Sequence, residues 1–361
     1  MTNKDTSALS EKDGVSLPET TSKSSAEKIK RNRRKTTSTE DFVTQIIAGN
    51  IPFLSRAITL VESTNPKHQQ QANEILEACL PHANRSVRIG ITGVPGVGKS
   101  TFIESFGKHL TSLGKKVAVL AVDPSSSVNK GSILGDKTRM EELVTDENAF
   151  IRPSPSGTSL GGVAQKTRES IILCEAAGFD TIIIETVGVG QSETAVHSMT
   201  DFFLLLKLAG AGDELQGIKR GIIEMADAIV INKADSGNEK NAKLAKVEFN
   251  RALHLYPAKE SGWQPKVLLA SALHHQGIDA IYAMIEEYMN LVKKSGYFQQ
   301  KRNEQNNYWL LETINQQLKN NFYNNPKIKE RLQQEVTKLE NGKTTPFTAA
   351  KRLLNKNYGR Q

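Results

Sequence analysis

The stretch Arg88-Ile-Gly-Ile-Thr-Gly-Val-Pro-Gly-Val-Gly-Lys-Ser-Thr101 decides which fold the chain is expected to take. It starts as a short apolar strand and continues as a glycine-rich loop, Gly93–Ser100, which matches the phosphate-binding pattern G-x-x-x-x-G-K-S/T at every position. Glycines allow backbone conformations that side chains forbid, so successive N–H groups can converge on a phosphate. A structural glycine turn is the alternative, but a complete motif between a strand and a helical segment favours a nucleoside triphosphate site.

The end of the loop and the helix after it supply positive charge for the phosphates. Lys99 is expected to face the β- and γ-phosphates, and the Ser100 hydroxyl can ligate Mg²⁺. The helix that begins near Lys99 would present its positive end to the anion. The residues expected to bind the phosphates are Gly93, Val94, Pro95, Gly96, Val97, Gly98, Lys99, Ser100 and Thr101.

A second motif, Asn232-Lys-Ala-Asp235, follows the buried strand expected at Ala228–Asn232. The Asp235 carboxylate can accept both N1–H and the exocyclic amino group of guanine, whereas adenine would leave it unpaired. Asn232 can hold the loop, and the aliphatic stem of Lys233 can cover the base. The four letters alone are a weak signal, but their place after a strand and downstream of the glycine loop makes GTP the predicted nucleotide.

The last expected strand, Val267–Ala270, ends in Ser271-Ala272-Leu273. This sequence resembles the S-A-x loop of GTPases, in which backbone N–H groups contact the guanine carbonyl. We therefore expect Ser271, Ala272 and Leu273 to lie at the base.

Three acidic residues are placed where a metal ion on the phosphates would need them. Asp123 follows the strand expected at Lys116–Val122, Asp136 lies in the next loop, and Glu185 ends a further buried strand. Carboxylate and hydroxyl oxygens are ligands that Mg²⁺ prefers, so these acids join Ser100 as candidate Mg²⁺ ligands. For Asp136 a solvated loop acid is an equal alternative.

The segment Glu185-Thr-Val-Gly188 occupies the place where most GTPases carry D-x-x-G. Glu185 can hold a Mg²⁺-bound water there, and the Gly188 N–H can face the γ-phosphate. Familiar small GTPases place a water-orienting Gln directly after that Gly, whereas this chain has Val189 and reaches Gln191 two positions later. We therefore expect slow intrinsic hydrolysis that rises when a partner or a mobile loop completes the site.

Apolar strand segments alternate with loops and helical segments between residues 87 and 270. Near-continuous apolar runs such as Lys116–Val122 are typical of parallel strands with both faces covered. We expect an α/β fold with a mostly parallel sheet, helices on both faces, and ligands at the carboxyl ends of the strands. Strands are expected at Val87–Thr92, Lys116–Val122, Thr181–Glu185, Phe202–Leu208, Ala228–Asn232 and Val267–Ala270.

Composition and periodicity divide the chain into four parts. The polar, low-complexity residues 1–38 are expected to form a disordered basic tail. Helical spacing predicts an N-terminal helical extension over residues 39–87, and the GTPase domain follows over residues 88–290. Residues 291–361 read as helices rich in Gln, Asn and Lys, so we expect a C-terminal arm that packs against a partner. Its helices are expected at Trp309–Tyr323, Pro326–Leu339 and Thr348–Leu354.

The formal net charge of +8 raises the question of nucleic acid as a partner. The densest basic run, Lys28–Lys35, has no aromatic residue to stack on bases and lies in the polar tail, so we do not expect a nucleic-acid contact. The longest apolar runs, such as Phe202–Leu206, are too short to span a membrane. With no apolar N-terminal segment and only two cysteines, Cys79 and Cys174, we expect a cytoplasmic protein.

Several further segments have family-specific sequences. They are Ala121–Ser126, Gly131–Met140, Glu185–Glu193, Gly212–Gly221 and Pro346–Ala350, in addition to Gly93–Thr101 and Asn232–Asp235. With them the chain resembles the MeaB/ArgK family of P-loop GTPases, the chaperones of adenosylcobalamin-dependent methylmalonyl-CoA mutase. The resemblance runs from about residue 40 to the C-terminus.

The resemblance implies a SIMIBI-type P-loop NTPase fold and a homodimer formed by the C-terminal helices. It implies that the protein binds the mutase and couples GTP binding and hydrolysis to cofactor loading, protection and reactivation. Gly212–Gly221 matches a third switch loop, in which Gln216 and Lys219 engage the nucleotide when the partner is bound. A mobile Lys219 would supply the transition-state charge that Val189 cannot. The acids that match the family's Mg²⁺-linked residues are Asp123, Asp136 and Glu185.

A metal-insertion GTPase, an accessory protein that loads an ion into a metalloenzyme, is the alternative function. Such chains usually carry a Cys/His cluster, whereas Cys79 and Cys174 stand apart and His274-His275 is the only adjacent His pair. A kinase or ATPase of basic amino-acid transport fits poorly, because no membrane span is predicted and Asn232–Asp235 selects guanine. A role for GTP as a bound ligand only stays open, because no water-orienting Gln follows Gly188.

Overall fold

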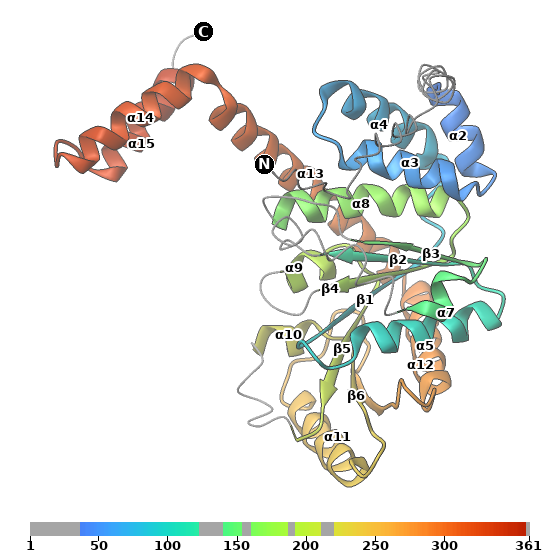
Figure 1. Cartoon of the computed structure of the whole chain (residues 1–361). Coiled ribbons are helices and arrows are strands. Elements are labelled where there is room, and N and C mark those ends of the chain that lie inside the picture. Colours follow the sequence, from blue (N-terminus) through green and yellow to red (C-terminus); the bar gives the residue numbers. More distant parts are fainter. Residues whose placement is uncertain (1–36, 123–139, 154–159, 187–191, 211–219, 359–361) are drawn as a thin grey trace, which may run out of the picture.

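The computed structural model describes residues 37–122, 140–153, 160–186, 192–210 and 220–358. Seven strands form one parallel sheet in the order β3-β2-β4-β1-β5-β6-β7 (Figure 1). The strand that leads into the glycine loop, β1, is at the centre, so the predicted α/β fold is confirmed. The strands are β1 Val87–Gly93, β2 Val117–Val122, β3 Ala149–Arg152, β4 Thr181–Thr186, β5 Phe202–Leu208, β6 Ala228–Asn232 and β7 Lys266–Leu269.

Strand β3 was not predicted from the sequence. It pairs in parallel with β2 at the edge of the sheet, and only Phe150 and Ile151 of its residues are buried. So short an apolar segment has no detectable period. The pairing partner, rather than the local sequence, makes it a strand.

Helices cover both faces of the sheet because both sides of its strands are apolar. On β1, Ile89 and Ile91 point to one face, and on the neighbouring β4, Ile182 and Ile184 point to the other. The helices over the first face are α5 Lys99–Ser112, α7 Glu141–Val144 and α12 Ile278–Ser295. Those over the second are α8 Leu160–Ala176, α9 Ser192–His197, α10 Arg220–Met225 and α11 Glu239–Leu253.

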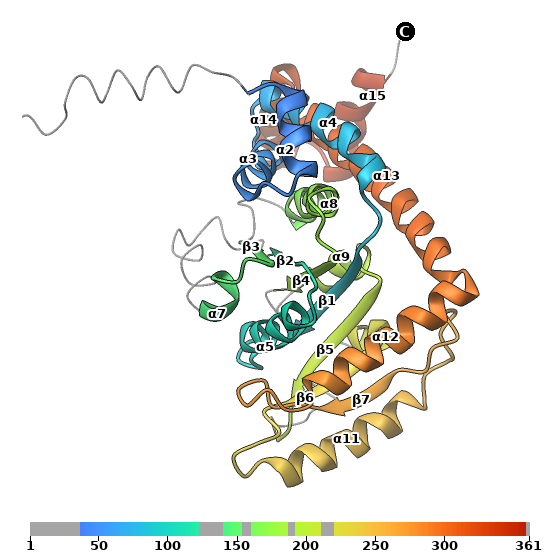
Figure 2. The same ribbon diagram turned by 90° about the vertical axis from the view of Figure 1, so that its right-hand side faces the viewer.

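Three N-terminal helices form a further layer outside α8 (Figure 2). Asn50 and Asn65 cap two of them, each accepting a hydrogen bond from a backbone N–H of the first turn, and a proline follows each cap. The helical extension predicted ahead of β1 is therefore present. Its helices are α2 Thr39–Ile47, α3 Ile51–Glu62 and α4 Pro66–Cys79.

A C-terminal arm leaves the body along one long helix, α13, Tyr297–Asn324. Gly296, in a left-handed conformation with φ of 80°, separates it from α12. Because residues 297–308 are mostly polar, the sequence predicted this helix only from Trp309. Helices α14, Pro326–Glu340, and α15, Pro346–Tyr358, lie side by side at the far end (Figure 1). None of the helices in the described ranges is long and apolar enough to cross a membrane.

A buried ionic cluster fixes the first half of α13 to the amino ends of β1 and β5. Arg302 donates to both carboxylate oxygens of Asp201 at 2.9 and 2.8 Å, and to two backbone carbonyls before β1 at 3.0 and 2.7 Å. Lys301 donates to the Asp201 carbonyl at 2.8 Å. Arg88 forms a second buried pair with Glu175 at 2.9 Å. Burial alone would raise the pKa of the Asp201 carboxyl, but the hydrogen bonds and charge of Arg302 hold it below its ordinary value.

The same helix follows the segment that joins α9 to β5. Gln305 donates to the Thr200 carbonyl at 2.8 Å, and the Trp309 indole donates to the Ser198 carbonyl at 3.1 Å. These bonds continue the row that begins at Arg302, about one helical turn apart. The first half of α13 is therefore part of the body of the protein.

Candidate nucleotide-binding site

The glycine loop between β1 and α5 has the backbone that its sequence predicts. Gly96 and Gly98 adopt left-handed conformations, with φ of 81° and 90°. A Cβ at Gly98 would lie 2.9 Å from Nδ2 of Asn232. A Cβ at Gly93 would lie 2.6 Å from the carbonyl oxygen of Leu206 on β5. The loop is therefore pressed against its neighbours too closely for side chains at these two positions.

We expect Gly98→Ala to weaken binding of a fluorescent GTP analogue by roughly 5- to 30-fold. A left-handed alanine costs about 1–2 kcal/mol, and its Cβ would displace Asn232. Gly114→Ala is the matched control, since Gly114 is left-handed at the other end of α5 with no atom within 4 Å of its Cβ. Equal losses in the two variants would show that the contact with Asn232 is irrelevant.

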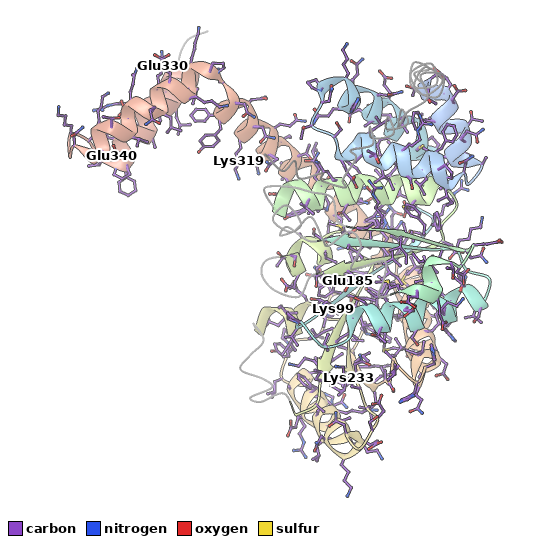
Figure 3. The ribbon with its side chains drawn as sticks, in the orientation of Figure 1. Lys99, Glu185, Lys233, Lys319, Glu330 and Glu340 are labelled. Carbon is purple, nitrogen blue, oxygen red and sulfur yellow. The ribbon has the colours of Figure 1, made fainter. Side chains whose placement is uncertain are left out.

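Lys99 lies buried inside the loop. Its ammonium donates to the carbonyl oxygens of Gly93 at 2.8 Å and Val94 at 3.4 Å. Burial lowers the pKa of this ammonium, and the carboxylates of Glu185 and Glu193 oppose the shift. Figure 3 shows Lys99 and Glu185 next to each other at the carboxyl ends of the strands. A cation and a carboxylate thus lie near each other beside the loop.

Three loops at the strand ends are tied together by side chains of the second motif. Asn232, buried at the end of β6, donates to the Val97 carbonyl at 2.9 Å and accepts from the Ala272 N–H at 3.2 Å. Lys233 has a left-handed backbone, with φ of 56°, and its ammonium donates to the Gly96 carbonyl at 3.0 Å. The predicted role of Asn232 in holding the loop therefore has a structural basis.

Asp235 and Ser271 connect the two loops that the sequence predicts at the base. The Ser271 hydroxyl donates a hydrogen bond to the partly buried Asp235 carboxylate and accepts one from the His274 N–H at 3.3 Å. Leu273 is 69% exposed, so its side chain is available to cover a ligand. A carboxylate and backbone N–H groups in adjacent loops can recognise the edge of a guanine base.

Two predicted Mg²⁺ ligands lie in the described part of the chain. Glu185 is at the end of β4, in register with Ile91 on β1 and Ala121 on β2, and Ser100 is in the first turn of α5. A hydroxyl and a carboxylate beside a phosphate loop are the donors that Mg²⁺ takes from proteins, completed by phosphate oxygens and waters. The residues present therefore fit Mg²⁺.

The other predicted switch and metal residues cannot be placed. Asp123, Asp136, Gly188, Val189, Gln191, Gln216 and Lys219 lie outside the described residues. Within those residues, no three His, Cys, Asp or Glu side chains gather as a metal site. Cys79 and Cys174 are buried free thiols, and burial raises the pKa of Cys79 to about 11. The adjacent His274 and His275 are exposed, and His275 is hydrogen-bonded to the Ser105 hydroxyl at 2.7 Å.

The sequence analysis missed two features of this site. Glu193 is buried in the first turn of α9, and its charge opposes the lowering of the Lys99 pKa. The sequence indicated this residue only as part of the segment Glu185–Glu193. Thr92 and Thr186 form a buried hydroxyl pair at 2.8 Å. The threonine pair could have been predicted from the polar residues that end two otherwise apolar strands. Glu193 could have been predicted from its position as an acid in a segment of Gly, Ser and Val.

Comparisons with known proteins agree with this geometry. A family model described as methylmalonyl Co-A mutase-associated GTPase MeaB matches residues 54–327. The GTPase ArgK of Escherichia coli is 47% identical over 84% of this chain and 92% of its own length. The mitochondrial methylmalonic aciduria type A homolog of Mus musculus is 44% identical over 86% of this chain and 77% of its own length. A crystal structure of an LAO/AO transport system kinase has a TM-score of 0.70 and 39% identity, covering 88% of this chain and 96% of that one.

Proposed function

The chain belongs to the MeaB family of GTPases, and we propose that it is a chaperone of adenosylcobalamin-dependent methylmalonyl-CoA mutase, or of a related acyl-CoA mutase. The extent of the family match carries this proposal. It covers residues 54–327, and so includes most of α3 and all of α4 before the nucleotide site and the whole of α13 after it. Nucleotide motifs are common to many GTPases, whereas this match extends through the flanking helices on both sides of the nucleotide site. The metal-insertion alternative has only the shared motifs in its favour.

We assign the nucleotide contacts as the sequence predicted them. The N–H groups of residues 93–101 and the Lys99 ammonium bind the β- and γ-phosphates, after Lys99 exchanges its carbonyl partners for phosphate oxygens. Asp235 accepts N1–H and the amino group of guanine, with the backbone of Ala272 and Leu273 at the carbonyl. Asn232 and Lys233 hold the base loop against the phosphate loop, as their bonds to Val97 and Gly96 support.

Ser100 and Glu185 would hold Mg²⁺, Glu185 through a bound water, with Asp123 and Asp136 as the further acids. The ion would neutralise charge on the β- and γ-phosphate oxygens. Lys99 would steady the phosphoryl oxygens, and Glu185 would hold the metal-bound water. The charge of Glu185 opposes the lowering of the Lys99 pKa by burial, which supports placing both side chains at the same loop.

In this proposal, GTP hydrolysis stays slow until the partner binds. Val189 cannot orient the attacking water, so the isolated protein hydrolyses GTP slowly. Binding of the mutase brings Lys219 and Gln216 of the third switch loop to the nucleotide, where Lys219 offsets the charge of the transition state and Gly188 contacts the γ-phosphate. GTP turnover is thereby coupled to cofactor loading and reactivation of the mutase.

The arm supports a homodimer. Leu310, Leu311 and Ile314 are exposed on α13, and Phe347 at the start of α15 is 86% exposed. Figure 3 shows α14, with Glu330 and Glu340 labelled, standing clear of the body. Exposed apolar side chains on a projecting helix favour burial against another chain. We accordingly propose residues 291–361 as the dimerisation arm, beside the tail 1–38, the extension 39–87 and the GTPase domain 88–290. A cytoplasmic location stays a prediction.

Single-turnover GTP hydrolysis with and without purified mutase tests the proposed function. We expect a slow rate for the protein alone and an increase on the order of 10²-fold with mutase, the usual effect of one transition-state charge donor. Lys219→Ala should lose this increase, whereas Lys240→Ala, which changes an exposed lysine of α11, should keep it. A fast rate without partner contradicts the switch mechanism. Failure of the mutase both to stimulate hydrolysis and to co-purify from native extract with GTP added contradicts the chaperone assignment.

A further inference from the structure

Two threonines face each other at the ends of the central strands. The Thr186 hydroxyl at the end of β4 donates to Thr92 Oγ1 near the end of β1 at 2.8 Å. Thr92 is 1% exposed and Thr186 is fully buried, so water does not compete for this bond. The pair is a short polar connection inside an apolar sheet.

Packing alone does not require hydroxyl groups at this place. The same face of β4 carries Ile182 and Ile184, and both belong to the apolar core beneath α8. Valine has the shape of threonine and would fill the same volume without the cost of burying a hydroxyl. Two hydroxyls at facing positions form a hydrogen bond with each other. This bond fixes the relative position of the two strand ends, which two valines could not do.

The position of the pair connects the two parts of the candidate site. The parallel ladder between β1 and β4 has its last backbone pair at Ile91 and Glu185. The hydroxyl bond lies one residue beyond it on each strand. Thr92 directly precedes Gly93, where the phosphate loop begins, and Thr186 directly follows Glu185. The bond therefore extends the connection between the strands to the residues where both leave regular structure.

We propose that Thr92 and Thr186 are positioning residues for GTP hydrolysis, whose hydrogen bond fixes the Glu185 carboxylate relative to the phosphate loop. The inference rests on the role proposed for Glu185. A bond between strand ends limits the distance by which β4 can slide or splay from β1. A displacement of about 1 Å at a catalytic group is enough to slow a reaction strongly, so the bond affects the rate more than the affinity.

Thr186→Val tests this directly, because it removes the hydroxyl and keeps the shape. We expect the single-turnover rate of GTP hydrolysis to fall by about three- to tenfold, the effect of one hydrogen bond. GTP affinity, measured with a fluorescent analogue, should change by less than about twofold, since the loop itself is intact. Thr186→Ser, which restores the hydroxyl, should recover the rate.

Thr181→Val is the matched control, since Thr181 is a buried threonine at the other end of β4 whose hydroxyl bonds to its neighbour Asp180 at 2.9 Å. It should leave the hydrolysis rate unchanged. The pair Thr92→Val with Thr186→Val separates positioning from stability. The single variant leaves one buried hydroxyl without its partner, whereas the double variant has no such hydroxyl. The double variant should therefore regain most of the wild-type melting temperature but keep the low rate of GTP hydrolysis.

The proposal is rejected if Thr186→Val hydrolyses GTP at the wild-type rate, if Thr181→Val is equally slow, or if the double variant regains rate and stability together. If the wild type and Thr186→Val hydrolyse GTP at the same rate, only the positioning role is rejected. A wild-type protein that hydrolyses no GTP, with or without mutase, rejects the proposed function itself.

Discussion

Asp235→Asn is expected to lower the affinity for GTP by about 10²- to 10⁴-fold and to raise the affinity for xanthosine triphosphate. The proposed contact consists of two hydrogen bonds from guanine to one carboxylate, each worth about 1.5–3 kcal/mol. Asparagine can accept only one of them, and its amide N–H groups face the guanine amino group. Xanthine carries a carbonyl in place of that amino group, so the amide can donate to it.

Competition between unlabelled nucleotides and a fluorescent GTP analogue measures both affinities. Glu239→Gln provides the control, because it removes an acidic charge at the start of α11, four residues away, and keeps the Oε1 that accepts a hydrogen bond from the Gly237 N–H. It should bind GTP nearly as well as the wild type. If the two variants lose GTP affinity equally, long-range charge rather than base recognition explains the effect.

Arg302→Met is expected to lower the free energy of unfolding by about 3–5 kcal/mol. The substitution leaves the fully buried Asp201 carboxylate without the guanidinium that pairs with it, and an uncompensated buried charge is costly. It also removes the donors to two backbone carbonyls before β1. Arg302→Lys should recover little, because an ammonium cannot make the paired bonds to both carboxylate oxygens.

Urea unfolding, followed by circular dichroism, measures this change. Lys301→Met is the control, since Lys301 is the neighbouring cation on α13 but gives up only one hydrogen bond, to the Asp201 carbonyl. It should cost about 1 kcal/mol. The folded-state pKa of Asp201 is lowered, so its stabilisation is present above the unfolded pKa of about 3.9 and is lost as pH falls below that value. A loss below about 1 kcal/mol for Arg302→Met would contradict the importance of the pair.

Much of the candidate site could be predicted because its residues lie in short contiguous motifs. Gly93–Thr101 and Asn232–Asp235 are local motifs at the ends of strongly apolar strands, and the carboxyl ends of parallel strands meet at one edge. That is why the contact between Asn232 and Val97, residues far apart in sequence, follows from two separate motifs. Lys99 lies inside the glycine loop, and its contact with the phosphates stays a prediction.

The connections that hold the molecule together had no such signal. Arg302 lies in a polar stretch of residues 297–308, where one arginine looks like any solvated charge. Its partner Asp201 is about a hundred residues earlier in the chain, between a short helix and a strand. The hydroxyl pair of Thr92 and Thr186 has the same difficulty, because only the register of β1 against β4 brings the two side chains together. The contact of Arg302 with Asp201 and that of Thr92 with Thr186 both depend on tertiary pairing, which no local sequence pattern predicts.

The row of bonds along α13 has a mechanical consequence for the arm. Hydrogen bonds hold the helix from Arg302 to Trp309, and it lies against α8 as far as Gln316 before it carries α14 and α15 at its outer end. A force on those two helices would therefore act on α8 as well as on the connection between α9 and β5. That connection lies at the amino end of β5, on the opposite edge of the sheet from the glycine loop, so within the described residues a force on the arm would reach that loop through the sheet and α8.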